Sequence, residues 1–185
     1  MLYTGKGDSG TTKTFDAKPG ERISKASAIT EALGALDEVN SFLGVVKVKA
    51  TEEGPKLHGT PLADIVHGLQ KNLFIVQAEL AGAPKTIEPG KVVALEGLIN
   101  TIEKELPPIT TFFISGGTEL AALFDVARTM ARRAERRVVA VVEGGERKMG
   151  DHSRAFLNRL SSILYALARL TNHLSGIKED APDYT

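Results

Sequence analysis

A short segment near the start of the chain combines glycine, lysine and threonine in a pattern that suits phosphate binding. Residues 4–14 read TGKGDSGTTKT. The glycines would let the backbone turn several N–H groups toward one point, while lysines and threonine hydroxyls add charge and donors. The spacing of Gly5 and Gly10 is that of a Walker A loop, but no Lys-Ser or Lys-Thr pair follows directly. The pattern therefore indicates either a triphosphate-binding segment or a flexible polar tail.

An arginine-rich stretch, ARTMARRAERR, is the second candidate. At about 100° per residue on a helix, Arg128, Arg132 and Glu135 fall on one line at the border of an apolar stripe. Arginines at such a border must meet carboxylates or phosphates, because burying them unpaired is costly. Glu135 could orient these arginines or bind a ribose hydroxyl. Arg133 and Arg137 point further toward solvent, where a run of charge is usually a solvated face.

Three further patterns are less specific. The loop FFISGG at residues 112–117 would plug the core with at least one of its phenylalanines. Asn158 interrupts an apolar-rich helical pattern, where a buried amide needs hydrogen-bond partners. Asp64 and His67 have the spacing of a carboxylate-bridged metal pair, but a di-iron bundle needs two such motifs and the chain has one. We therefore interpret the Asp64–His67 spacing as chance.

Five segments with helical apolar spacing would carry these residues. Prolines separate the segments, because proline is costly inside a helix. The expected helices cover residues 24–49, 62–81, 90–106, 118–138 and 153–174. Thr118 is a suitable N-cap for the fourth helix. Five amphipathic helices joined by short loops predict an all-α, up-and-down five-helix bundle in a single domain, residues 1–185.

Composition limits the possible functions. Lysine plus arginine and aspartate plus glutamate each number 23, so the formal net charge is zero, which argues against a general nucleic-acid binder. The chain has no cysteine, which excludes disulfides, thiolate metal sites and a cysteine nucleophile, and fits a reducing cytoplasm. It has no run of 18 apolar residues and no signal-peptide pattern, so we expect a cytoplasmic protein without a membrane partner.

Taken together, these stretches resemble the PduO-type ATP:corrinoid adenosyltransferases. They occur in the family's order and extend from residue 3 to about residue 172, nearly the whole chain. The matching stretches are YTGKGDSGTT from Tyr3, GALDEVNS from Gly34, FFISGG from Phe112, the arginine-rich stretch from Ala127 through Val139, and LNRLS from Leu157. Any one of them is a weak signal, but five in order strongly indicate the family.

The resemblance implies that cobalt(I) of a reduced corrinoid attacks C5′ of ATP, which forms adenosylcobalamin and releases triphosphate. It implies a homotrimer with active sites between subunits, with Mg²⁺ shared by the phosphates and with cobalamin as substrate. The cofactor carries the difficult step, so the protein needs no catalytic base. We expect residues 1–22 to form an ATP-binding segment, residues 23–176 the bundle and residues 177–185 a C-terminal tail.

Site residues follow from the resemblance position by position. The expected ATP contacts of the N-terminal part are Thr4, Gly5, Lys6, Gly7, Thr11, Thr12, Lys13 and Lys25. Those of the helices are Arg132, Arg133, Glu135, Arg136 and Asn158. Asp37 and Arg128 match a pair thought to bridge subunits, and with Arg132 and Phe112 they form the expected catalytic set. Phe112 matches the aromatic residue beneath the corrin, and Phe113 would contact the corrinoid beside it.

The sequence departs from the family pattern near Ser9, where lysine or arginine is usual, and near Ser115, where proline is usual. Residues 48–61 follow no recognisable pattern. Two other functions stay open at this point. One is a non-catalytic helical module that binds nucleotides or nucleic acid through its arginines. The other is a regulatory bundle that binds ATP or a corrinoid without transferring a group.

Overall fold

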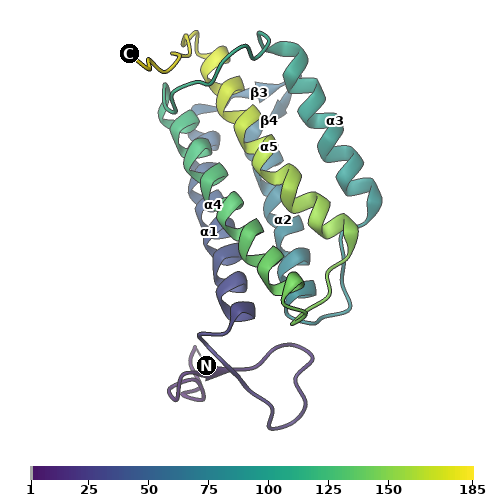
Figure 1. The fold of residues 1–185 in the computed structure, drawn as a ribbon. Helices are drawn as coiled ribbons and strands as arrows, with labels where there is room; N and C mark the ends of the chain where they lie inside the picture. Colours follow the sequence, from purple (N-terminus) through teal and green to yellow (C-terminus); the bar gives the residue numbers. More distant parts are fainter. Residues whose placement is uncertain (1) are drawn as a thin grey trace.

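The computed structural model describes residues 2–185 as five helices with two short strand pairs (Figure 1). The helices are α1 (Ala28–Glu53), α2 (Leu62–Leu80), α3 (Pro89–Glu105), α4 (Glu119–Glu143) and α5 (Asp151–Leu174). Antiparallel pairs join β1 (Thr11–Thr12) to β2 (Ile23–Ser24) and β3 (Lys56–Leu57) to β4 (Thr60–Pro61). The predicted helical architecture is confirmed. The strands were not predicted, because two residues leave no alternating pattern.

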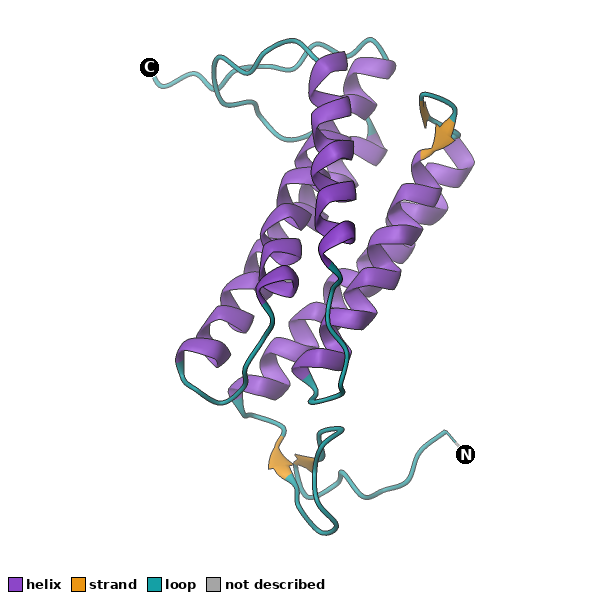
Figure 2. Cartoon of the chain, turned by 90° about the vertical axis from the view of Figure 1, so that its right-hand side faces the viewer, coloured by secondary structure: helices purple, strands orange, loops and turns teal. Residues whose placement is uncertain are grey.

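Consecutive helices run in opposite directions, as expected for an up-and-down bundle. Helix α1 packs against α2 and α4, and α5 packs against α4 and α3. The segment before α1 lies beyond one end of the bundle, whereas the C-terminal residues lie at the other end (Figures 1 and 2). The core consists of apolar side chains from all five helices, and its largest fully buried members include Phe124, Phe156, Leu36, Leu43, Leu73, Ile102 and Leu160.

The helix boundaries differ from the prediction at α1, which begins and ends four residues later, and at α4, which continues to Glu143 beyond the predicted end at residue 138. Ser24 was predicted to begin the first helix, but it belongs to β2, and Ser27 caps the helix by accepting a hydrogen bond from the Thr30 N–H. The predicted N-cap of α4 is confirmed, since the Thr118 hydroxyl accepts from the Ala121 N–H at 3.1 Å. Although apolar, Val93 of α3 does not face the core and is 67% exposed.

Arg169 on α5 fixes the loop that joins α3 to α4. This arginine is only 5% exposed, so its charge needs partners. Its Nε donates to Glu179 in the C-terminal tail at 2.8 Å, and an Nη donates to the Pro107 carbonyl at 3.2 Å. Its guanidinium lies 4.9 Å from the centroid of the Phe113 ring. One side chain therefore connects α5, the loop and the tail.

Asn172, one turn further along α5, fixes the other end of the same loop. Its amide donates to the Gly116 carbonyl at 2.8 Å and accepts from the Thr118 N–H at 3.0 Å. A Cβ at position 117 would lie 2.3 Å from the Asn172 carbonyl oxygen, and the backbone there has φ +100°, so this position requires glycine. Residues 107–118 are thus held by two polar side chains of α5 and by a hydrogen bond from the Ile114 N–H to the Asp180 carbonyl of the tail, at 2.9 Å.

We predict that Arg169→Ala lowers the free energy of unfolding by about 3 kcal/mol, because it removes a buried guanidinium and leaves the Glu179 carboxylate, which is 16% exposed, without its charged partner. Urea titration would measure the change. Arg154→Ala is the matched control, since Arg154 is exposed and pairs with Asp151 one turn earlier on the same helix. The control should lose less than about 0.5 kcal/mol. Equal, small losses in the two variants would contradict the anchoring role of Arg169.

Candidate functional site

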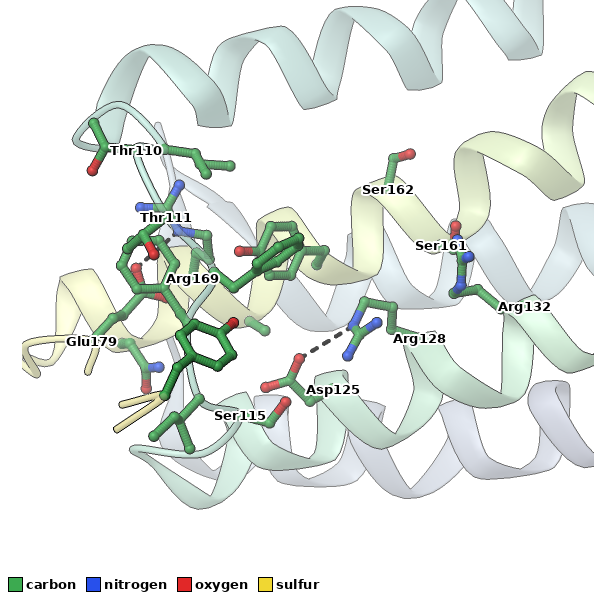
Figure 3. A pocket seen from close by; sticks show the side chains of 18 residues that line it. Thr110, Thr111, Ser115, Asp125, Arg128, Arg132, Ser161, Ser162, Arg169 and Glu179 are labelled. Atoms are coloured by element: carbon green, nitrogen blue, oxygen red, sulfur yellow. Dashed lines mark hydrogen bonds and ion pairs between the residues drawn. The ribbon is translucent and has the colours of Figure 1, made fainter. Parts of the chain in front are cut away.

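An open cavity of about 850 Å³ lies between the loop before α4 and the facing sides of α4 and α5 (Figure 3). This volume is enough for a large organic ligand. Four of the predicted site residues line it, namely Phe112, Phe113, Arg128 and Arg132. Other polar or charged side chains that line the cavity are those of Asp125, Ser161, Ser162, Tyr165, Arg169, Glu179 and Tyr184. The structure therefore brings the predicted corrinoid-binding residues together with two of the predicted catalytic arginines.

The two phenylalanines of the loop differ in their surroundings. Phe113 is half-buried and stacks on Arg169, which gives it a role in holding the loop. Phe112 is 76% exposed although it is a large apolar side chain. Ile109, Ile114 and Tyr184 line the same cavity and are also exposed, so Phe112 belongs to an apolar patch of the kind that marks a ligand-binding surface. The expectation that one of the two phenylalanines is structural is met by Phe113.

The opposite wall is cationic. Arg128 is half-buried, with its Nε 3.3 Å from Asp125 and its guanidinium 5.8 Å from the centroid of the Tyr165 ring. Arg132 lies one turn further along α4, is exposed, and extends toward Ser161 on α5 (Figure 3). Within residues 2–185, no carboxylate forms an ion pair with Arg132. Burial raises the pKa of the Tyr165 phenol further above its ordinary alkaline value, so this wall of the cavity carries no anionic tyrosine at neutral pH.

Beyond Arg132, further polar side chains lie between α4 and α5; together with Arg128 and Arg132, Glu135 and Asn158 form what we call the polar row. Asn158 donates to the Glu135 carboxylate at 2.9 Å and accepts from Arg159 at 2.7 Å. Arg159 is in turn held by Glu96 of α3 at 3.0 Å. Asn158 is exposed, so the burial suggested by its apolar neighbours in sequence was wrong. Its amide orientation is nevertheless fixed, because the two groups it contacts require opposite ends of the amide.

The arginines on the next face of α4 have different partners. Arg133 pairs with Glu38 and Arg137 pairs with Glu31, both on α1. These contacts join α4 to α1, and both arginines are exposed to solvent, as is Arg136. Asp37, predicted to pair with Arg128 across subunits, is an exposed residue of α1. Within one chain, the carboxylate beside Arg128 is that of Asp125.

The N-terminal segment forms a compact turn structure. Gly5 and Gly10 adopt left-handed backbone conformations, with φ +67° and +76°. The Gly10 carbonyl accepts from the Lys25 N–H at 2.9 Å, and a Cβ at Gly7 would lie 2.9 Å from the Lys25 Nζ. The lysine side chain therefore lies directly over the glycine turn. This arrangement brings together Gly7, Thr11 and Lys25, three of the predicted ATP-binding residues.

Arg22 holds the segment in this shape. Its Nε donates to the Thr11 hydroxyl at 2.7 Å, and an Nη donates to the carbonyls of Lys6 and Thr11 at 2.8 and 2.7 Å. The Lys6 and Lys13 side chains are exposed. Their ammonium groups are thus available to an anion at the surface of the segment, as are the exposed Thr4 and the half-buried Thr12.

The two parts of the predicted site are separated within one chain. The N-terminal segment lies beyond the end of the bundle where α1 begins, and the Phe112 loop lies at the opposite end (Figure 1). Among the described residues, none before position 109 lines the cavity. The structure therefore does not bring Lys6, Lys13 and Lys25 together with Arg132 in a single copy.

Sequence reasoning missed several residues of the cavity. Asp125 could have been identified, because it lies three positions before Arg128 on the same helix. Arg169 was also detectable as an arginine within an otherwise apolar run, a position at which a charged residue is rarely buried unless paired. Glu179 and Tyr184 belong to a tail without helical pattern, and nothing in their spacing indicated that they reach the cavity.

Two general properties of the described residues bear on function. Within residues 2–185, none of the helices has the length and hydrophobicity needed to span a bilayer. Over the same residues, no three histidine, cysteine, aspartate or glutamate side chains are grouped so that they could hold a metal ion.

Comparisons with known proteins agree with this geometry. The family model for cobalamin adenosyltransferase matches residues 2–171. The corrinoid adenosyltransferase PduO from Citrobacter freundii is 36% identical over 93% of this chain and 50% of its own length. The corrinoid adenosyltransferase from Bacillus subtilis is 35% identical over 95% of this chain and 89% of its own length. The chain spans about half the length of the PduO relatives from Citrobacter freundii and Salmonella typhimurium.

A solved structure has the same fold. It is a variant of the PduO-type ATP:corrinoid adenosyltransferase from Lactobacillus reuteri in complex with cobalamin and ATP, with a TM-score of 0.86 and 28% identity. The match covers 100% of this chain and 97% of that one. The helical architecture, the cavity with its free aromatic ring and arginines, and the extent of these matches lead to one conclusion: the chain belongs to the cobalamin adenosyltransferase family.

Proposed function

We propose that this protein transfers the 5′-deoxyadenosyl group of ATP to the cobalt of a reduced corrinoid, forming adenosylcobalamin and releasing triphosphate. The observation that carries the proposal is that the exposed Phe112 ring lines the same cavity as Arg128 and Arg132. An apolar surface and a polar, cationic row are the two features that a corrinoid and a nucleotide would each require. Relatives named as corrinoid adenosyltransferases support the assignment.

The apolar end of the groove suits the corrin. Phe112 would pack beneath the flat macrocycle and exclude both water and a lower axial ligand from the cobalt. Loss of that ligand favours a four-coordinate cobalt(II), which is easier to reduce to the nucleophilic cobalt(I). Phe113 would contribute by fixing the loop, since its ring is held against Arg169.

The polar end of the groove suits ATP. Arg132 carries a charge that no carboxylate within residues 2–185 neutralises, so a phosphate would be a natural partner. Glu135 and Asn158 are fixed against each other and present oxygen and amide groups of the kind that bind ribose hydroxyls. Lys6, Thr12 and Lys13 would contact the phosphates from the N-terminal segment, with Thr4, Gly5, Gly7, Thr11 and Lys25 shaping its surface.

The chemistry places few demands on the protein. A Co–C5′ bond forms while the C5′–O bond to triphosphate breaks, and the leaving group takes the electron pair. Because the cobalt supplies the nucleophile, the side chains need only position the two substrates and stabilise charge on the triphosphate. Magnesium would arrive with ATP and be coordinated mainly by phosphate oxygens, which fits a chain whose described residues contain no carboxylate cluster.

The N-terminal segment and the cavity between α4 and α5 lie at opposite ends of one chain, so a complete site would need two copies of the chain. We infer a homotrimer in which the N-terminal segment of one copy reaches the α4–α5 groove of the next. Val45 and Val48 on α1 and Val126 on α4 are large apolar side chains left exposed, as expected for a face that a neighbouring copy covers. Asp37 on the same helix would then be free to meet Arg128 of the neighbouring copy.

The direct test is to incubate the protein with ATP, Mg²⁺, cobalamin and a reductant that generates cobalt(I). We expect a light-sensitive cobalt–carbon product in the absorption spectrum, with one triphosphate released per product. Binding of ATP or corrinoid without triphosphate release would instead show a non-catalytic binding module. Salt-sensitive RNA binding without transfer would favour the nucleic-acid alternative.

We predict that Phe112→Ala slows adenosylation of cobalamin by at least about tenfold, whereas the dissociation constant for ATP changes less than about twofold. The reason is that the ring would act on the corrin and not on the nucleotide. Steady-state kinetics and equilibrium ATP titration would measure the two effects. Phe74→Ala is the matched control, because Phe74 is an exposed phenylalanine on α2 outside the cavity. Equal losses in transfer and in ATP binding would count against the role of Phe112.

A further inference from the structure

The N-terminal segment contacts the bundle at a second place besides the start of α1. Arg147, in the loop between α4 and α5, holds Asp16 through two contacts, with Nη1–Oδ2 at 2.5 Å and Nη2–Oδ1 at 3.3 Å. Next to this pair, the Phe15 N–H donates to the Ala81 carbonyl at 2.8 Å, just beyond the end of α2. Asp16 therefore lies where the loops after α2 and α4 meet.

The fit at this contact is close. A Cβ at Gly82 would lie 2.4 Å from the Asp16 carboxyl carbon, and the backbone there has φ +93°. No other residue would let the carboxylate approach so closely. The Arg147 side chain is only 19% exposed, so it is held against the protein and does not extend freely into water.

The charge of this pair is present under all working conditions. The hydrogen bond from the Arg147 guanidinium, helped by one from Thr14, lowers the pKa of Asp16 from 3.8 to about 2. Because the folded-state pKa is lowered, any stabilisation by the pair is fully present above the ordinary pKa and is lost only as the pH falls through about 2. At neutral pH the pair is ionised.

The loop that carries Arg147 is itself anchored. The Gly150 N–H donates to the Glu79 carboxylate of α2 at 2.7 Å. The Ser153 hydroxyl also donates to Glu79 and accepts from the Ile87 N–H at 3.1 Å. Glu79 thus joins the end of α2 to the start of α5. Gly82 lies just after the end of α2, and Arg147 lies just before the start of α5. Asp16 therefore contacts a surface formed by the end of α2 and the α4–α5 loop, which Glu79 ties to the start of α5.

We propose that Asp16 and Arg147 form a positioning pair that sets the location of the phosphate-binding lysines relative to the bundle. Only two residues separate Lys13 from Asp16, so the Cα atoms lie within about 11 Å along the chain. Fixing Asp16 therefore restricts where the Lys13 ammonium can reach. The inference rests on the proposed function for its effect on ATP, but the anchoring itself is independent of that function.

Two measurements on Asp16→Ala test the inference. The first is the rate of tryptic cleavage after Lys13, which should rise at least about fivefold because the segment detaches more often. The second is steady-state kinetics. We expect the KM for ATP to rise about fivefold to tenfold, since only a fraction of the protein has the segment in place, while kcat at saturating ATP changes less than about twofold.

Further variants separate a positioning role from a general loss of stability. Arg147→Ala should match Asp16→Ala, the double variant should be no worse than either single one, and Arg147→Lys should recover part of the KM. Arg154→Ala, which removes a nearby exposed ion pair within α5, should behave as wild type in both assays.

The outcomes distinguish this inference from the proposed function. Wild-type rates of cleavage in Asp16→Ala would overturn the inference, as would an unchanged KM for ATP in an active enzyme. If the wild-type protein performs no transfer but Asp16→Ala is cleaved faster, the proposed function fails and the anchoring is supported.

Discussion

The packing of α4 against α5 is the interaction on which the site depends. Phe124 of α4 and Phe156 of α5 are fully buried, and the small side chains of Ala127 and Ala131 face the core between them. This contact fixes the rotation of both helices. It therefore determines that Arg128 and Arg132 face α5 and that Asn158 faces Glu135. A rotation of either helix by one residue, about 100°, would move the polar row out of the groove.

The same packing explains why buried charge appears at one end of the bundle. The last turns of α5 extend past the start of α4 and must hold an irregular loop of about twelve residues without regular backbone bonding. Arg169 and Asn172 supply the missing partners. Because these side chains satisfy the loop, the Phe112 ring need not pack inward and can remain exposed. Arg169 and Asn172 thus hold the loop in a conformation that leaves the Phe112 ring exposed.

Much of this arrangement could be predicted from the sequence, because it follows from local periodicity. The helices, the Thr118 cap and the common line of Arg128, Arg132 and Glu135 all depend on spacing along one helix. The contacts of Arg169 could not be predicted, since they join residues far apart in the chain. For the same reason, nothing in the N-terminal segment indicated that it would lie at the end of the bundle opposite Phe112. The candidate site residues were proposed from their types and from the family resemblance, whereas their division between the two ends of the bundle is visible only in the structure.

This division is the central claim, and mixing two inactive variants tests it directly. Lys6→Ala/Lys13→Ala removes the two exposed ammonium groups of the N-terminal segment, whereas Arg132→Ala removes the guanidinium group in the cavity between α4 and α5. Each variant should be inactive alone. After co-refolding at equal ratio, about a quarter of wild-type transfer activity should return, since one site in four would combine two intact halves from different copies. No recovery, in mixed oligomers shown to contain both variants, would contradict a site shared between subunits.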